Sequence, residues 1–213
     1  FSIVIPLYNK EKYIQRSINS VLNQTIQDFE LIIVNDGSDD ASVKIVESHK
    51  DERIRLITKR NEGVSVARNT GIINSKYEYI AFLDADDEWL PDFLETILRL
   101  IIDFPQAKAF GTATKSVVND AYRNKMFSTL PNHPWCGEIK NIFRTIVYDT
   151  PPITASSVCI QKMVFKNTGM FPVGIKRGED QDTWIRVFLK YNIAFSTAHK
   201  VICHDDHEGG SIV

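Results

Sequence analysis

Short apolar runs alternate with segments of helical periodicity throughout the first half of the chain. The continuous apolar runs predict strands over residues 2–7, 29–34, 54–58 and 79–83. Between and after them, apolar side chains recur at helical spacing over residues 14–22, 43–49, 64–74 and 93–102. Parallel strands need a crossover connection, which is usually a helix. The alternation therefore indicates an α/β fold with a mostly parallel sheet flanked by helices.

The second half of the chain is less regular. Strands are predicted over residues 107–118, 155–161 and 193–203, helices over 137–148 and 179–191, and a long loop over 119–134. Neither a linker nor an internal repeat separates this half from the first. We therefore expect one domain with two halves, residues 1–107 and residues 108–213.

Composition narrows the functional classes. A net charge of −2 provides no general attraction to nucleic acid or to an anionic membrane. The three cysteines lie far apart, and neither a membrane span nor a signal peptide is visible, so a reducing cytoplasm is the expected location. Because the chain begins at Phe1 rather than Met, we interpret it as an excised piece, and a flank could carry a membrane anchor or a further domain.

A cluster of carboxylates ends one of the apolar runs abruptly. Asp84, Asp86 and Asp87 directly follow the apolar residues 80–83. Aspartate is a poor strand former, and like charges this close repel one another. Mg²⁺ or Mn²⁺ would offset the repulsion and bridge the carboxylates to substrate phosphates. A turn followed by a helix N-cap would explain the same residues without any ligand, and both interpretations stay open on this stretch alone.

Two other predicted strands also end in polar residues. Tyr8 follows the first strand and Asp36 the second, and ligands of open α/β sheets bind beyond such strand ends. Asp36 could accept hydrogen bonds from a base or a ribose, or only close an Asx-turn. The absence of GxGxxG and GxxxxGK(S/T) segments disfavours dinucleotide oxidoreductases and P-loop hydrolases. Diphosphate charge would then fall to a metal and to Arg68, unless Arg68 is only a solvated helix residue.

A second acidic cluster opens the helix predicted over residues 179–191. Asp180 lies four residues before Trp184, so their side chains share one helix face. A carboxylate beside an indole is partly desolvated and more basic, which makes Asp180 a candidate general base, although favourable placement at the helix dipole would also account for it. Near the C-terminus, His207 and its neighbouring carboxylates could complete a metal site or belong to a polar tail.

Five motifs occur along the chain in a recognisable order. They are Ser2-Ile-Val-Ile-Pro-Leu-Tyr-Asn9, Phe29-Glu-Leu-Ile-Ile-Val-Asn-Asp-Gly-Ser38, Asn61-Glu-Gly-Val-Ser-Val-Ala-Arg-Asn69, Phe82-Leu-Asp-Ala-Asp-Asp87 and Gly178-Glu-Asp-Gln-Asp-Thr-Trp184. Together they closely resemble the family-2 glycosyltransferases of the GT-A fold, over nearly the whole chain. The resemblance implies a nucleotide-sugar-binding half, residues 1–107, and an acceptor-binding half, residues 108–213, of one GT-A domain.

The resemblance also implies which residues bind the nucleotide. Pro6, Tyr8 and Asp36 match positions that line the nucleotide-base pocket of the family. Asp84, the first residue of the DxD motif, would lie near the ribose. Arg68 matches an arginine often found in this segment of the family and is assigned to the nucleotide site.

Metal binding and catalysis are implied for other matching positions. Asp86, the second residue of the DxD motif, would be a metal ligand, and Asp180 would be the catalytic base. His207 and Ser211 resemble the His-x-x-Ser element of the family near the diphosphate, with one more residue between them, and His207 is assigned to the metal. The QxxRW motif of processive members does not follow Trp184, which favours a single-addition transferase.

The implied enzyme is an inverting, non-processive, metal-dependent glycosyltransferase. It would move a sugar from a nucleoside-diphosphate sugar, most simply a UDP-sugar, to a hydroxyl group of a saccharide or lipid-linked acceptor in glycan, polysaccharide or glycolipid synthesis. Mg²⁺ or Mn²⁺ would be the cofactor, and nucleic acid is not an expected partner. A lipid-linked acceptor would place this cytoplasmic domain at the inner face of the membrane.

Two other functions compete with this one. A catalytically silent nucleotide-sugar or carbohydrate-binding module could use the same fold, but it would have no need of Asp84, Asp86 and Asp180 together. A nucleotidyltransferase that makes sugar nucleotides would usually have a glycine-rich basic loop after its first strand to hold a triphosphate. The residues after the first strand here lack that loop.

Overall fold

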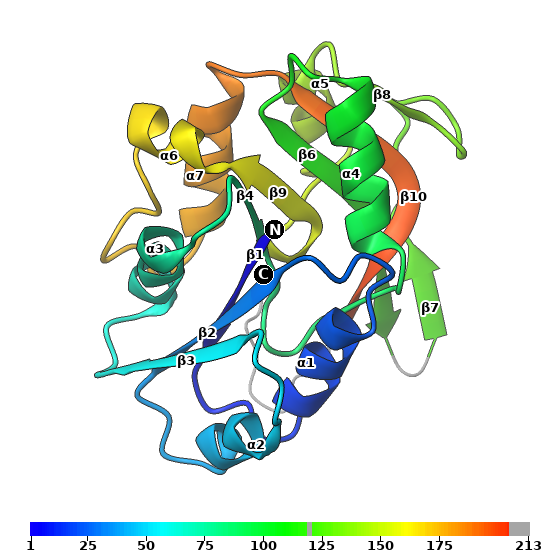
Figure 1. Cartoon of the computed structure of the whole chain (residues 1–213). Helices are drawn as coiled ribbons and strands as arrows, with labels where there is room; N and C mark the ends of the chain where they lie inside the picture. Colours follow the sequence, from blue (N-terminus) through cyan, green and yellow to red (C-terminus); the bar gives the residue numbers. More distant parts are fainter. Residues whose placement is uncertain (119–120, 205–213) are drawn as a thin grey trace.

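The strands of this protein form one mixed sheet that runs through both halves of the chain. The computed structural model describes residues 1–118 and 121–204. Within these residues the sheet has ten strands in the order β3-β2-β1-β4-β9-β6-β10-β5, with β7 paired to β6 and β8 paired to β10 (Figure 1).

The bounds of the elements are as follows. The strands are β1 (Ser2–Leu7), β2 (Glu30–Asp36), β3 (Ile54–Lys59), β4 (Tyr79–Phe82), β5 (Glu88–Trp89), β6 (Ala109–Val118), β7 (Ala121–Asn124), β8 (Cys136–Glu138), β9 (Val158–Gln161) and β10 (Ile193–His204). The helices are α1 (Ile14–Leu22), α2 (Ser42–Ser48), α3 (Val64–Asn74), α4 (Phe93–Asp103), α5 (Ile142–Tyr148), η1 (Ala155–Ser157), α6 (Lys162–Thr168) and α7 (Glu179–Phe188).

The first half of the sheet is parallel. β1 pairs in parallel with β2 and β4, and β2 pairs in parallel with β3. Every residue of β1 and β2 is buried, which explains why these strands read as continuous apolar runs rather than as alternating ones. The predicted α/β single domain is therefore confirmed, with the parallel arrangement strongest where the sequence pattern was clearest.

Beyond β4 the sheet becomes mixed. β9 pairs antiparallel with both β4 and β6, whereas β6 and β10 run parallel to each other. Because β4 and β9 join the two halves in one hydrogen-bonded sheet, both halves share a single scaffold. Their separate binding roles stay a prediction.

Helices cover both faces of the sheet, and alternate residues of β1 belong to different cores. Ile3, Ile5 and Leu7 pack in the cluster that includes residues of α1, α2 and α4. Val4 packs in the cluster that includes residues of α3, α6 and α7. Figure 1 shows these two sets of helices on opposite sides of the sheet. The period-2 geometry of a strand thus makes β1 the middle of three layers.

Helix α3 approaches β1 closely because Gly71 has no side chain. A Cβ atom built at Gly71 would lie 2.3 Å from Val4 Cγ1 and 2.8 Å from its Cγ2. A side chain at position 71 would therefore push α3 away from β1. The close contact at Gly71 fixes how deeply the N-terminal end of α3, which carries Arg68, sits against the sheet.

Several elements of the second half were missed or misplaced from the sequence. β7 lies inside the predicted loop 119–134, and all four of its residues are exposed, so it carries no apolar signal. Helix α6 was not predicted because only Val164 and Phe165 are buried in it. The strand predicted over residues 155–161 begins with the short helix η1, and the helix predicted over 137–148 begins only at Ile142, after β8. Across residues 1–118 and 121–204, none of the helices has the length and apolar character needed to span a bilayer.

Candidate functional site

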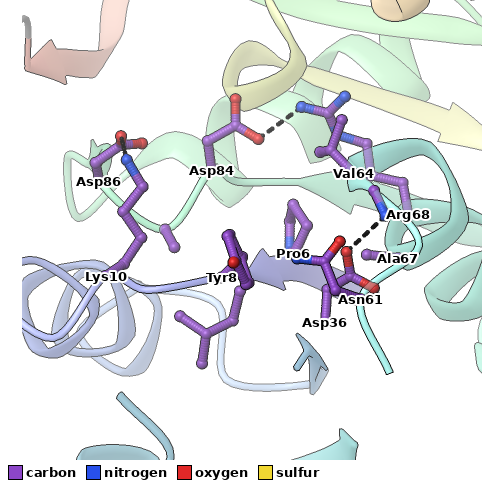
Figure 2. Close-up of a pocket in the computed structure, with 13 residues that line it drawn as sticks. Pro6, Tyr8, Lys10, Asp36, Asn61, Val64, Ala67, Arg68, Asp84 and Asp86 are labelled. Atoms are coloured by element: carbon purple, nitrogen blue, oxygen red, sulfur yellow. Dashed lines mark hydrogen bonds and ion pairs between the residues drawn. The ribbon is translucent and has the colours of Figure 1, made fainter. Parts of the chain in front are cut away.

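A cavity of about 450 Å³ lies at the carboxyl ends of β1, β2 and β4, a size common for ligand sites. Its two ends are shown in Figure 2, with Asp36 and Asn61 at one end and Asp84 and Asp86 at the other. The lining residues are Pro6, Leu7, Tyr8, Lys10, Asp36, Asn61, Gly63, Val64, Ala67, Arg68, Asp84, Ala85 and Asp86. Six of the residues singled out from the sequence therefore share one cavity, as expected for strand ends at one edge of a sheet.

Asp36 is held rigidly at its end of the cavity. Its side chain accepts a hydrogen bond from Lys59 Nζ at 2.7 Å and from the backbone N–H groups of Glu62 at 3.1 Å and Gly63 at 2.8 Å. Gly63 adopts φ 94°, a conformation that favours glycine, which lets its N–H reach the carboxylate just before α3 begins. Two of these donors use Oδ1 and one uses Oδ2, so Oδ2 keeps capacity for a ligand donor. The turn-closing and ligand-binding roles of Asp36 are thus compatible.

Helix α1 holds the backbone of residues 83–87, which connect β4 to β5 and are called the aspartate loop below. Ser17 Oγ lies 2.8 Å from Ala85 O and 2.6 Å from Asp87 O and shares its one proton between these two acceptors. Arg16 Nη2 donates to Asp86 O at 2.5 Å. These bonds hold the carboxylate-bearing loop against helix α1, with Asp84 and Asp86 lining the cavity.

Arg68 links this loop to helix α7. It is 4% exposed and donates from Nη2 to Asp84 Oδ1 at 2.8 Å and from Nη1 to Glu179 Oε1 at 2.8 Å. Burial disfavours its charge, but the two carboxylates outweigh that effect and raise the pKa of Arg68. Its guanidinium lies 5.2 Å from the centre of the Phe171 ring, and its buried Nε has no hydrogen-bond partner among the described residues. Arg68 is therefore a built part of the site and not a solvated helix residue.

Asp180 lies at the start of α7, next to the residue that Arg68 binds. Burial raises the pKa of Asp180, and the charges of Glu179 and Asp84 add to this effect. A hydrogen bond from the backbone N–H of Gln181 and the charge of Arg68 oppose it. A raised pKa makes a carboxylate a better proton acceptor, which suits a general base. The structure thus brings Asp180 into the electrostatic surroundings of Asp84, but its catalytic role stays a prediction.

Trp184 is a buried core residue of α7. It is 2% exposed and packs at 6.2 Å from the Phe82 ring and 5.3 Å from the Phe171 ring, measured between ring centres. These ring contacts join α7 to β4 through the core. Burial is the largest cause of the raised pKa of Asp180, and a contribution of the indole to that burial stays a prediction.

Sequence reasoning did not single out Ser156, which organises the aspartate loop. Its buried Oγ accepts a hydrogen bond from the Asp84 N–H at 3.1 Å and donates to Asp87 Oδ2 at 2.5 Å. Burial, together with the charge of Asp84, raises the pKa of Asp87 to about 8. Serine in a short helix is too common a feature to have revealed this role from the sequence.

The structure describes two of the acidic residues of the predicted metal site, Asp84 and Asp86. No group of three His, Cys, Asp or Glu side chains that could hold a metal ion occurs within residues 1–118 and 121–204. His207 lies outside the described residues. Asp84 and Asp86 are nevertheless carboxylates at the mouth of a cavity, and Mg²⁺ or Mn²⁺ is commonly held by one or two carboxylates plus substrate phosphates. The donor set fits such an ion, and metal binding stays a prediction.

A helix-flanked sheet with a cavity and acidic residues at the ends of its parallel strands is the arrangement of α/β proteins that bind ligands at this edge. The sequence profile of Glycosyl transferase family 2 matches residues 2–164, which is most of the chain. The chain therefore belongs to glycosyl transferase family 2, as its motifs predicted.

Individual relatives agree with this assignment. An uncharacterized glycosyltransferase of Rickettsia bellii (strain RML369-C) is 37% identical over 87% of this chain, and one of Rickettsia felis (strain ATCC VR-1525 / URRWXCal2) is 35% identical over 90%. The chain spans only 26% and 31% of the length of these two relatives.

A solved structure shows the same fold. The crystal structure of S. aureus TarS 1-349 in complex with UDP-GlcNAc matches all of this chain with a TM-score of 0.83 and 24% sequence identity, and the match covers 61% of TarS 1-349. This likeness extends through both halves of the sheet and confirms the predicted GT-A fold.

Proposed function

We propose that this chain is the catalytic domain of a nucleotide-sugar-dependent glycosyltransferase that inverts the anomeric centre and adds one sugar at a time. The observation that carries the proposal is the cavity itself. It runs from Asp36, which keeps one free acceptor site, to Asp84 and Asp86, with Arg68 between this end and the helix that carries Asp180. Such a cavity offers a base-binding end, a diphosphate end and a nearby proton acceptor.

A nucleoside-diphosphate sugar is the donor that fits this arrangement. S. aureus TarS 1-349, which shares the fold, has been crystallised with UDP-GlcNAc and with UDP. Asp36 Oδ2 can accept a hydrogen bond from a base N–H, and the exposed face of Tyr8 lies in the same cavity. These features favour a UDP-sugar, with its base near Asp36, its ribose near Asp84 and its phosphates near Asp86.

Asp180 is the proposed general base. In an inverting transfer, the acceptor hydroxyl loses its proton to the base as its oxygen attacks the anomeric carbon, and the diphosphate leaves from the opposite face with the bonding electron pair. The raised pKa of Asp180 favours acceptance of that proton. Glu179, held by Arg68 at 2.8 Å, fixes the first turn of α7 and so orients Asp180.

The leaving diphosphate needs positive charge. Asp86, with Asp84 beside it, would hold Mg²⁺ or Mn²⁺, which when bound supplies a Lewis acid for the departing phosphate. The chain provides its own cation in Arg68, whose buried guanidinium stays charged. Single addition is proposed because QxxRW does not follow Trp184. A saccharide or lipid-linked acceptor would approach from the half formed by residues 108–213.

Calorimetric titration of UDP, GDP and TDP, each with and without Mn²⁺, tests the donor part of this proposal. We expect UDP to bind, and to bind more tightly with Mn²⁺. Asp36→Asn is the matched variant, because it keeps the size of the side chain but exchanges an acceptor for a donor, and it should weaken UDP binding. A wild-type protein that binds none of the three nucleotides would refute the donor assignment.

Release of UDP from a UDP-sugar tests catalysis separately. Asp180→Asn should lower the rate of sugar transfer by about 10²- to 10⁴-fold while UDP still binds. If the wild-type protein binds UDP but releases none from a panel of UDP-sugars mixed with saccharide acceptors, a silent nucleotide-sugar-binding module becomes the better account.

A further inference from the structure

The side chain of Asp86 is paired with a cation that belongs to this chain. Lys10 Nζ lies 2.6 Å from Asp86 Oδ2 (Figure 2), and the two side chains are 35% and 25% exposed. Lys10 follows the end of β1, and its backbone N–H donates to Ser42 Oγ at 2.9 Å. This bond fixes the backbone of Lys10, whereas its four-carbon side chain can change rotamer. The Lys10 ammonium is therefore paired with the carboxylate that would bind a divalent ion in the proposed function.

The two carboxylates of the DxD motif have partners of different kinds. Asp84 is bound by Arg68, which is 4% exposed and also held by Glu179. Lys10 is more exposed, and its ammonium is a compact charge at the end of a flexible stem. Arg68 is thus fixed in place, whereas Lys10 can leave Asp86 without disturbing the core.

An aromatic ring and a second cation lie close to Lys10. Lys10 Nζ lies 5.7 Å from the centre of the Tyr13 ring. Arg16 Nη2 donates to the backbone oxygen of Asp86 at 2.5 Å, so a second positive charge lies close by. Repulsion between these two cations favours movement of the Lys10 ammonium toward any anion that enters the cavity.

We propose that Lys10 is a tethered counter-cation of the donor site, which pairs with Asp86 in the empty site and moves to the donor diphosphate when a donor binds, whether or not a divalent ion then occupies Asp86. The inference rests on the proposed function and adds a residue to it. Lys10 lines the cavity at the same end as Asp84 and Asp86, where the diphosphate belongs in that function. Two consequences follow, because Lys10 competes with a divalent ion for Asp86 and attracts diphosphate even when no ion is present.

The test compares four proteins of the full chain by calorimetry: wild type, Lys10→Met, Lys10→Arg and Lys44→Met. Lys44 is an exposed lysine of the adjacent helix α2 that does not line the cavity, so its substitution removes the same charge without touching the site. Each protein is titrated with Mn²⁺ alone and with UDP in a chelator. Urea unfolding of each variant checks that it folds as the wild type does.

We expect Lys10→Met to bind Mn²⁺ alone about two- to fivefold more tightly, because a competing ion pair of partly exposed groups has been removed. The same variant should bind UDP in the chelator about tenfold more weakly, because a charge-assisted hydrogen bond to phosphate is lost. Lys10→Arg should retain most of the UDP affinity, and Lys44→Met should behave as the wild type.

Two results would overturn the inference, and they are distinguishable. If the wild type binds UDP and Lys10→Met binds both Mn²⁺ and UDP as the wild type does, Lys10 has no such role and the proposed function stands. If the wild type binds none of UDP, GDP and TDP in either buffer, the donor site itself is refuted and the role of Lys10 falls with it.

Discussion

Removal of the Arg68 guanidinium should destabilise the protein more through Glu179 than through Asp84. Both ion pairs have a distance of 2.8 Å, but Glu179 is 12% exposed and Asp84 is 34% exposed. A carboxylate that stays buried without its partner cannot recover its hydration, whereas an exposed one largely can. The difference in burial, and not in distance, should therefore decide the energies.

The magnitude follows from these two environments. A hydrogen bond to a charged group contributes about 1.5–3 kcal/mol when it is buried, so we assign about 2 kcal/mol to the Glu179 pair. The Asp84 pair is partly solvated, and we assign it about 1 kcal/mol or less. Arg68→Met should then lower the free energy of unfolding by about 3 kcal/mol, before any loss of contact with Phe171.

Double-mutant cycles measured by urea unfolding separate the two pairs. One cycle combines Arg68→Met with Glu179→Gln, and the other combines it with Asp84→Asn. Arg99→Met is the matched control, because its pair with Glu95 lies on the surface of α4, with Arg99 73% exposed, and should contribute less than about 0.5 kcal/mol. A coupling energy with Asp84 equal to or larger than that with Glu179 would refute the reasoning from burial. Arg68→Lys keeps the charge and allows the measurement if Arg68→Met does not fold.

Three further predictions concern catalysis, packing and the aspartate loop. Because burial raises the pKa of Asp180 and the base must be deprotonated, kcat/KM should fall on acidification at a higher pH than an ordinary aspartate with a pKa of 3.8 would give, and a pH profile with its acidic limb below 4 would contradict this. Gly71→Ala should lower the free energy of unfolding, measured in urea, by about 1–3 kcal/mol, because the new Cβ would lie 2.3 Å from Val4 Cγ1. The control is Ile73→Ala in the same helix, where the side chain is 65% exposed and the free energy of unfolding should change little. Ser156→Ala should reduce the free energy of unfolding by about 1–3 kcal/mol and raise KM for the donor more than it lowers kcat, and an unchanged KM would show that the serine does not position the loop.

The pattern of apolar residues predicted most of the strands and helices in the first half of the chain. β1 and β2 are buried on both faces, and their residues 3–7 and 31–34 form unbroken apolar runs. Helices α1 and α3 lie where the sequence placed them, at Ile14–Leu22 and Val64–Asn74. The strand ends converge because parallel strands share an edge, which is a property of the fold class. Exposed or short elements such as β7 and α6 carry too few buried side chains to leave such a signal.

The sequence by itself determined that Asp84, Asp86 and the residues assigned to nucleotide binding would gather at one edge of an α/β sheet. Only the tertiary structure decided which cation meets which carboxylate. Arg68 and Glu179 are 111 residues apart and Lys10 and Asp86 are 76 apart, so no spacing rule connects them. Local periodicity reports which face of an element is buried, whereas an ion pair depends on how separate elements dock, and that is fixed by packing such as the contact of Gly71 with Val4.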